Sequence, residues 1–367
     1  MDVQPTRRML QRMLLLLMLL AGMNSVGLLA QAGEIIQVCA QGCAYSDLRE
    51  AVGKAPNQST IFVDPGEYAG PVIIAKNLSI IGSDRNKVVI KRGVVAAGPF
   101  LVTLRNLTIT GGLNGLQAQG IAGLPPQLSP FVILEGVTIA GNAANGLALL
   151  NYARATLCDV LITKNGISVS GLPIGGGVAL RGSASIAIGF TVEGRTCAQS
   201  IIRENGANGL SAGDQSRVLI GANTVIAKHN LSGVELGGSA HATIQGLLSR
   251  ENACFGVSVE GDASATITDG RLERNGKAGL HVGGPAGTLP GCATQGEAHM
   301  HATASVSGTV IAQNRIGVLV GDLSKDFEEA TVQLTSLALS NNGCDLVVDP
   351  VAKKKVTIVG TLVKPCS

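Results

Sequence analysis

A triplet with apolar first and last residues and a variable middle residue returns along the chain, and each time it follows an asparagine and a glycine. Asn252 with Gly256 and Asn275 with Gly279 show the pattern clearly, and the interval between them is 23 residues. The triplets are Leu147–Leu149, Val234–Leu236, Val257–Val259, Leu280–Val282 and Val318–Val320. The asparagines are Asn142, Asn165, Asn205, Asn230, Asn252, Asn275, Asn314 and Asn341/Asn342.

A repeat of this length with short alternating strands cannot bury its apolar face alone, and stacking of successive coils solves that problem. Coils about 4.8 Å apart would pair as parallel strands, with the asparagines in a ladder of side-chain amides along the stack. Glycine would relieve the backbone where each coil turns. The pattern therefore predicts an all-β parallel solenoid of about ten coils. Leucine-rich repeats would need a different register of leucines, and a sandwich would not repeat asparagine at one coil length.

The N-terminal part of the mature chain is expected to cap this stack. Residues 45–56 predict a short amphipathic helix with Ser46 as N-cap and Leu48, Ala51 and Val52 on one face. Strands with glycine turns follow over 61–68, 71–83 and 87–93. We therefore assign 33–60 to a cap and 61–367 to the coils.

The helix, the segment TIFVDPGEYAGPVIIAKNLSIIGS (60–83) and the Asn-x-x-Gly coils together resemble the right-handed parallel β-helix proteins of the pectin-lyase-like superfamily. The resemblance covers roughly residues 35–366 and implies a single right-handed parallel β-helix. It implies no single activity, because that superfamily contains lyases, esterases, hydrolases, epimerases, adhesins and non-catalytic carbohydrate binders. The catalytic signatures of pectate lyases, polygalacturonases, pectin esterases and alginate epimerases are not found.

Three segments interrupt the repeat, at 111–130, 165–177 and 283–300, and each contains Leu-Pro among glycines. They are expected to protrude as loops. Such loops either wall a substrate groove or are neutral decoration of the surface.

The first 32 residues have the pattern of a secretory signal peptide. Arg7, Arg8 and Arg12 precede the apolar stretch 13–23, and Ala30-Gln31-Ala32 forms a cleavage site. An uncleaved signal anchor is the alternative. Either way the protein is expected to be secreted, periplasmic or part of the cell envelope, with no membrane span after signal removal.

The composition limits the classes of molecule that the protein is expected to bind. The formal net charge is +3, and it falls to about +1 without the signal, so no basic patch indicates nucleic acid. The chain has no Trp and three Tyr, which leaves few aromatic platforms for neutral sugars.

Eight cysteines in an exported chain predict disulfides. Cys158 and Cys197 take similar places in successive repeats, and Cys344 lies about one repeat before Cys366, so we expect all four to be bridged. No spacing indicates a metal site, and no cofactor is expected.

Two carboxylates and a histidine form the best catalytic candidate. The outward middle residues of successive triplets are Glu235, Ser258, His281 and Leu319, and Glu260 follows two residues after Ser258. Strand geometry puts Glu235 and Glu260 about 8 Å apart at Cα, within the range of about 6.5–9.5 Å that an inverting glycosidase needs. His281 could tune or replace one of them. The alternative is a solvated polar stripe.

A row of basic residues forms the binding candidate. Arg203, Lys228 and Arg250 stand two residues before their asparagines, where they could bind the uronate or sulfate groups of an acidic glycan. Glutamates alternate with them, so the same row could instead be a soluble sheet edge.

The sequence leaves open whether the protein is an enzyme. Missing signatures and scarce aromatics favour a non-catalytic protein that binds carbohydrate or plays a structural role. The alternative is a lyase or hydrolase that degrades an acidic glycan.

Overall fold

The computed structural model describes residues 33–121, 126–166, 175–190, 192, 194–284, 292, 301–321, 329–349 and 353–364. The predicted signal at 1–32 lies outside these residues, as do most of the predicted insertion at 283–300 and residues 167–174 of the insertion at 165–177. The account below concerns the compact unit Glu34–Ser367.

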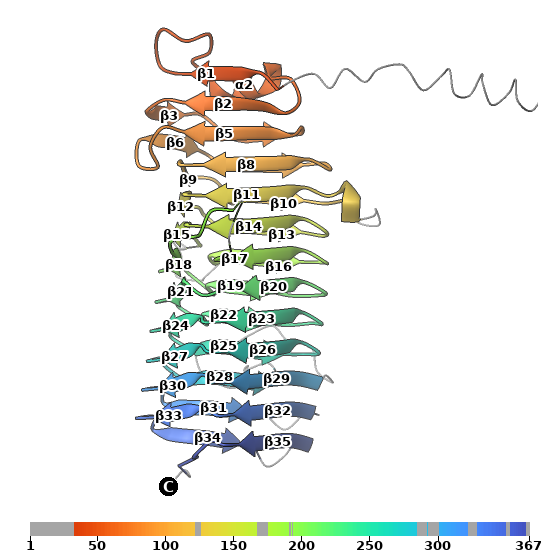
Figure 1. Ribbon diagram of the computed structural model, residues 1–367, viewed down its shortest axis with the longest axis vertical. Coiled ribbons are helices and arrows are strands. Elements are labelled where there is room, and N and C mark those ends of the chain that lie inside the picture. Colours follow the sequence, from red (N-terminus) through yellow and green to blue (C-terminus); the bar gives the residue numbers. More distant parts are fainter. Residues whose placement is uncertain are drawn as a thin grey trace, which may run out of the picture. The chain divides into compact units, whose positions relative to one another are not determined.

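Three parallel sheets run along this unit; each complete coil contributes one strand to each sheet, and sheet A has one further strand at either end (Figure 1). Sheet A contains β1 (Ile35–Val38), β2 (Ser59–Val63), β5 (Leu78–Gly82), β8 (Leu101–Arg105), β11 (Phe131–Glu135), β14 (Arg154–Cys158), β17 (Ser185–Ile188), β20 (Arg217–Ile220), β23 (His241–Gln245), β26 (Ser264–Thr268), β29 (His301–Ser307), β32 (Glu329–Thr335) and β35 (Lys353–Val359).

Sheet B contains β3 (Gly66–Tyr68), β6 (Val88–Lys91), β9 (Thr108–Thr110), β12 (Thr138–Ala140), β15 (Leu161–Thr163), β18 (Ser200–Arg203), β21 (Thr224–Ala227), β24 (Leu248–Arg250), β27 (Arg271–Glu273), β30 (Val310–Ala312) and β33 (Ala338–Ser340). Sheet C contains β4 (Val72–Ile74), β7 (Val94–Ala97), β10 (Leu116–Gln119), β13 (Leu147–Leu150), β16 (Val178–Arg181), β19 (Leu210–Ala212), β22 (Val234–Leu236), β25 (Phe255–Glu260), β28 (Ala278–Gly283), β31 (Ile316–Val320) and β34 (Cys344–Val348).

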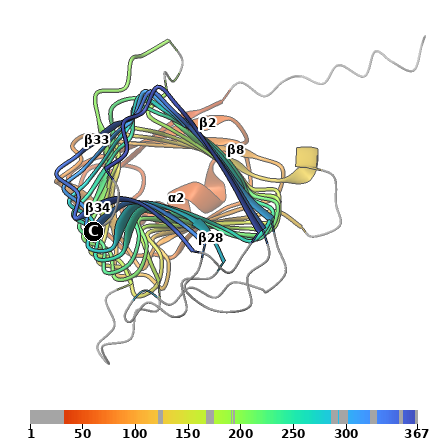
Figure 2. The same cartoon turned by 90° about the horizontal axis from the view of Figure 1, so that it is seen from below.

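The three sheets enclose one continuous aliphatic core (Figure 2). Successive residues of a strand point to opposite faces, so every second residue enters the core. In β26, for instance, Ala265 and Ile267 are buried while Thr266 faces outward. Small and branched aliphatic side chains fill the narrow interior, which explains a chain rich in Val, Ile and Leu with few aromatics.

The predicted helix caps the N-terminal end of the stack as α2 (Leu48–Lys54), with Leu48, Ala51 and Val52 buried. Its N-cap is Asp47 rather than Ser46. The Asp47 carboxylate accepts a hydrogen bond from the backbone N–H of Arg49 at 2.8 Å, which starts the helix one residue later than predicted.

A ladder of buried side chains follows sheet B, as the asparagine repeat predicts. The backbone N–H of Asn252 donates to Oδ1 of Asn275 at 3.2 Å, and Asn275 donates in the same way to Asn314 at 2.9 Å. The full ladder runs through Asn142, Asn165, Asn205, His229, Asn252, Asn275, Asn314 and Asn342.

His229 takes the place that the sequence pattern gives to Asn230. Its Nδ1 accepts from the N–H of Asn205 at 3.2 Å, and its Nε2 lies 3.1 Å from the carbonyl of Ile202. Asn230 is exposed. The assignment of Asn230 to the ladder is therefore wrong by one residue, because an imidazole can accept at one nitrogen and donate at the other, as a side-chain amide does.

The recurring glycine has a steric reason rather than the conformational one expected. A Cβ on Gly256 would lie 2.6 Å from the carbonyl oxygen of Gly279 and 2.9 Å from Nδ2 of Asn275. Glycine therefore lets each coil approach the ladder residue of the next coil.

The predicted insertion at 111–130 contains β10, which pairs with β7 and β13, so this part of it is an ordinary coil strand. The helical turn Pro126–Leu128 lies in its later part. Within the described residues no helix has both the length and the apolar character needed to cross a bilayer.

Disulfides link Cys39 to Cys43, Cys158 to Cys197 and Cys254 to Cys292. Cys344 is also in a disulfide, while Cys366, its predicted partner, lies outside the described residues.

Candidate functional site

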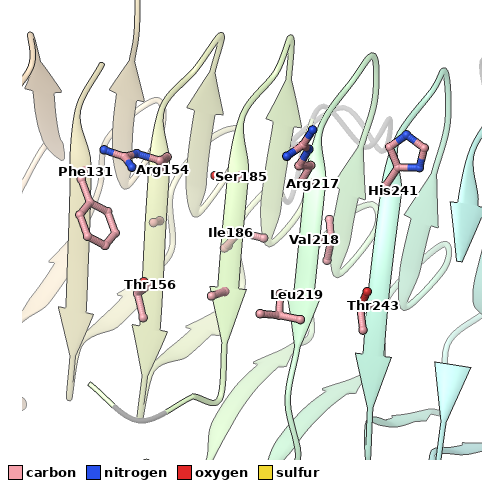
Figure 3. A pocket seen from close by; sticks show the side chains of 12 residues that line it. Phe131, Arg154, Thr156, Ser185, Ile186, Arg217, Val218, Leu219, His241 and Thr243 are labelled. Atoms are coloured by element: carbon pink, nitrogen blue, oxygen red, sulfur yellow. The ribbon is translucent and has the colours of Figure 1, made fainter. Parts of the chain in front are cut away.

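A groove of about 400 Å³ lies on the outer face of sheet A, across the middle of the stack (Figure 3). It extends over β11, β14, β17, β20 and β23, which are successive strands of that sheet. Its lining residues are Phe131, Arg154, Ala155, Thr156, Ser185, Ile186, Ala187, Arg217, Val218, Leu219, His241 and Thr243.

One row of side chains gives the groove its charge. Strand pairing places Phe131, Arg154, Ser185, Arg217 and His241 at the same register on successive coils, and Figure 3 shows them in this order. Parallel pairing without a slip repeats such a row at about 4.8 Å per coil. The row therefore contains two guanidinium groups and one imidazole among its five positions.

The cations of this groove have no acidic counterpart. None of the twelve lining residues is Asp or Glu. Arg154 and Arg217 are exposed, and among the described residues no carboxylate forms an ion pair with either. The Arg154 guanidinium lies 5.2 Å from the ring centre of Phe131, and His241 Nδ1 is 2.6 Å from the Ser264 hydroxyl. The groove therefore presents positive charge that is free to meet an anionic ligand.

Arg154 and Arg217 were missed from the sequence, although a signal for their register exists. A small residue directly precedes each of the four row positions from Arg154 to His241, namely Ala153, Ala184, Ser216 and Ala240. Each of these small residues is buried at the start of a sheet A strand. Aligning coils on them, rather than on the asparagines, would have brought the basic residues into one row.

The predicted basic row lies on sheet B and does not form as expected. Arg203 and Arg250 each pair in register with Ala227, so they are two coils apart. Lys228 falls one residue later, in a left-handed conformation with φ of 59°. The displacement follows from His229 taking the ladder position.

Glutamates neutralise much of this sheet B edge. Glu251 lies 3.7 Å from Lys228, 3.4 Å from Arg250 and 3.1 Å from Arg274. Glu204 lies 3.9 Å from Arg203. These exposed pairs match the alternative of a soluble sheet edge, and substrate binding by Arg203, Lys228 and Arg250 stays a prediction.

The catalytic candidates come together on sheet C in the predicted register. Glu235 pairs with Ser258, Ser258 with His281, and His281 with Leu319. The Ser258 hydroxyl donates to Glu260 at 2.6 Å and lies 2.7 Å from Nδ1 of His281. Asn208 donates to the Glu235 carboxylate.

Most of this carboxylate cluster is closed to water. Glu260 is 2% exposed, and Ser258 and His281 are 0% exposed. The His281 ring stacks on Phe255 with 4.6 Å between the ring centres, beside the buried Cys254–Cys292 disulfide. A base that must activate water on a glycan cannot act from full burial, which disfavours Glu260 and His281 in that role. The catalytic role of Glu235, Glu260 and His281 stays a prediction.

Glu235 is the member of the cluster that is partly exposed, and its electrostatics are unusual. Burial and the neighbouring Glu260 carboxylate together raise its pKa to about 7, against the opposing effects of Arg181 and of the Asn208 hydrogen bond. Near neutral pH, protonated and ionised Glu235 are therefore both well populated, and the protonated form can donate.

A family model described as "Right handed beta helix region" matches residues 186–349. The chain has the right-handed parallel β-helix fold. Among curated proteins no sequence matches this β-helix protein.

Three solved structures similar to the β-helix protein are a mannuronan epimerase module, an α-1,3-glucanase and DFA-IIIase. The A-module of the mannuronan C-5 epimerase AlgE6 from Azotobacter vinelandii shares 17% identity over 88% of this chain and 96% of that chain, with a TM-score of 0.57. The catalytic unit of a GH87 α-1,3-glucanase from Streptomyces thermodiastaticus shares 14% identity over 92% of this chain and 70% of that chain, with a TM-score of 0.54. DFA-IIIase from Arthrobacter chlorophenolicus shares 12% identity over 82% of this chain and 83% of that chain, with a TM-score of 0.51. At these identities the likeness concerns the fold alone.

Proposed function

We propose that the β-helix protein binds an acidic polysaccharide along the groove on sheet A. The observation that carries this proposal is the exposed row of Arg154, Arg217 and His241 in a groove without a lining carboxylate. Guanidinium groups bind carboxylates and sulfates through paired N–H donors. The similar solved structures include an epimerase of mannuronan, which supports a glycan as the partner.

The rest of the groove suits a sugar chain. Phe131 and Leu219 offer apolar contact, and Leu219 is 39% exposed. Thr156, Ser185 and Thr243 offer hydroxyl groups between the cations. Sugar recognition generally combines such apolar contact with a few convergent polar groups. The disulfides fit an oxidising compartment, so we place this activity outside the cytoplasm.

The Arg154→Ala/Arg217→Ala double variant is expected to bind an acidic polysaccharide about tenfold more weakly than the wild type. Each exposed ion pair contributes about 0.7 kcal/mol, and two such pairs together give about a factor of ten. Titration calorimetry with polygalacturonate, hyaluronan and neutral dextran measures the change, and added salt should weaken binding of the acidic polymers alone.

The Arg203→Ala/Arg250→Ala double variant is the matched control, because it removes the same charge from sheet B. It should bind like the wild type. If it loses binding and the groove variant does not, the ligand lies on sheet B. Binding of no acidic polymer would remove the proposal.

A second candidate function is hydrolysis or elimination on an acidic glycan, and the protonated Glu235 favours it because a general acid needs a pKa near the working pH. Release of reducing ends from acidic polysaccharides tests it. Release that falls at least about 100-fold in Glu235→Gln would establish an enzyme with this acid, in line with typical acid–base contributions. Unchanged release in the variant would place catalysis elsewhere.

A further inference from the structure

The two arginines of the groove stand on alternate coils. Arg154 pairs in register with Ser185, and Ser185 pairs with Arg217, so one coil without a charge separates them. The two coil steps amount to about 9.6 Å between the backbone positions. Figure 3 shows the short Ser185 side chain between the two long basic ones.

Among the described residues that line the groove, the coil between the arginines contributes no cationic side chain. Its groove residues are Ser185, Ile186 and Ala187, and Ile186 points into the core. On the neighbouring coils Thr156 and Leu219 stand at the register of Ala187. A carboxylate placed over Ser185 would meet only a neutral hydroxyl on its own coil, and the Arg154 guanidinium lies on the other side, over the Phe131 ring, which disfavours that place.

One coil step is close to the length of one sugar residue in an extended chain. A glycan along the stack therefore advances about one sugar per coil, with alternate sugars over Arg154 and Arg217. A carboxylate on every sugar would put one over Ser185 unless the chain twists it away.

We propose that the groove recognises an acidic polysaccharide with a disaccharide repeat, in which an acidic sugar alternates with a neutral one. The acidic sugars lie over Arg154 and Arg217, and the neutral sugar between them lies over Ser185 and Ala187. This inference rests on the proposed glycan binding and adds the spacing of the acidic groups along the bound glycan. Polyuronates with a carboxylate on every sugar are then the poorer ligands.

Competition between two acidic oligosaccharides of equal sugar count tests the spacing. Hyaluronan oligosaccharides carry a carboxylate on alternate sugars, and oligogalacturonates carry one on every sugar. The wild type is expected to bind the hyaluronan oligosaccharide at least threefold more tightly, although it has half the charge. A preference for oligogalacturonate, or equal affinity, would overturn the inference and leave the proposed function standing. No binding of either would remove both.

The Ser185→Arg variant adds a cation on the intervening coil. It should raise affinity for oligogalacturonate about threefold or more and leave hyaluronan affinity within a factor of two. Thr138→Arg on sheet B adds the same charge away from the groove and should change neither. An equal gain for both ligands in Ser185→Arg would show that total charge decides, which contradicts the spacing.

Discussion

Asn275→Ala is expected to lower the free energy of unfolding by about 3 kcal/mol. Oδ1 of Asn275 accepts from the backbone N–H and from Nδ2 of Asn252, at 3.2 and 2.9 Å, and its own Nδ2 donates to the carbonyl of Ser249. Asn275 is 2% exposed and Asn252 is 1% exposed, so water cannot replace the lost partner. Each buried polar group left unpaired costs about 1–3 kcal/mol. Urea unfolding followed by circular dichroism measures the change.

Asn230→Ala is the matched control. The sequence repeat assigns Asn230 to the ladder, whereas the structure leaves it exposed and puts His229 in its place. An exposed substitution of this kind should change stability by no more than about 0.5 kcal/mol. Equal losses in Asn230→Ala and Asn275→Ala would contradict the ladder through His229.

The architecture is accessible from the sequence because two simple periodicities encode it. Alternation along each strand decides which side chains enter the core, and the asparagine repeat fixes the coil length. Those two rules suffice to align Glu235, Ser258 and His281 on neighbouring coils, as the strand pairing confirms. The described residues contain 11 strands in each of sheets B and C, slightly more than the expected ten coils.

The functional surface is harder to predict from the sequence, because it depends on the local register of the strands and on which side chains neighbouring residues bury. One residue of displacement at His229 moves Lys228 out of line with Arg203 and Arg250, and no rule of composition reveals that shift. The burial of His281 involves the ring of Phe255, a position that the repeat does not mark. The row with Arg154 and Arg217 lies on a sheet whose strands carry no asparagine marker, so the repeat that gives the fold does not align it.

The His229→Asn variant is expected to remove about 2 kcal/mol of acid destabilisation at pH 5. Burial lowers the pKa of His229 to about 4 in the folded protein, from an ordinary value of 6.5. The unfolded chain therefore binds more protons between these values, so stability falls as the pH drops from 6.5 towards 4. At pH 5 the difference is about 1.5 pKa units, or roughly 2 kcal/mol.

The two hydrogen bonds of the His229 ring show why burial lowers its pKa rather than raising it. Nε2 carries the proton towards the Ile202 carbonyl, and Nδ1 must stay unprotonated to accept from the N–H of Asn205. A second proton, on Nδ1, would point at the backbone N–H of Asn205, and the two donors would repel each other. An asparagine amide keeps one acceptor and one donor at every pH, as Asn252 does on the next coil.

Unfolding of both proteins at pH 7.5 and pH 5 measures this effect, because other titrating groups contribute equally to the two proteins. The stability difference between the two pH values should shrink by about 2 kcal/mol in His229→Asn. Asn230→Ala, an exposed substitution beside the ladder that removes no titrating group, should leave that difference as in the wild type. An unchanged pH dependence in His229→Asn would mean that His229 titrates alike in the folded and unfolded chains, and the ladder would then have to tolerate a charged ring between Asn205 and Asn252.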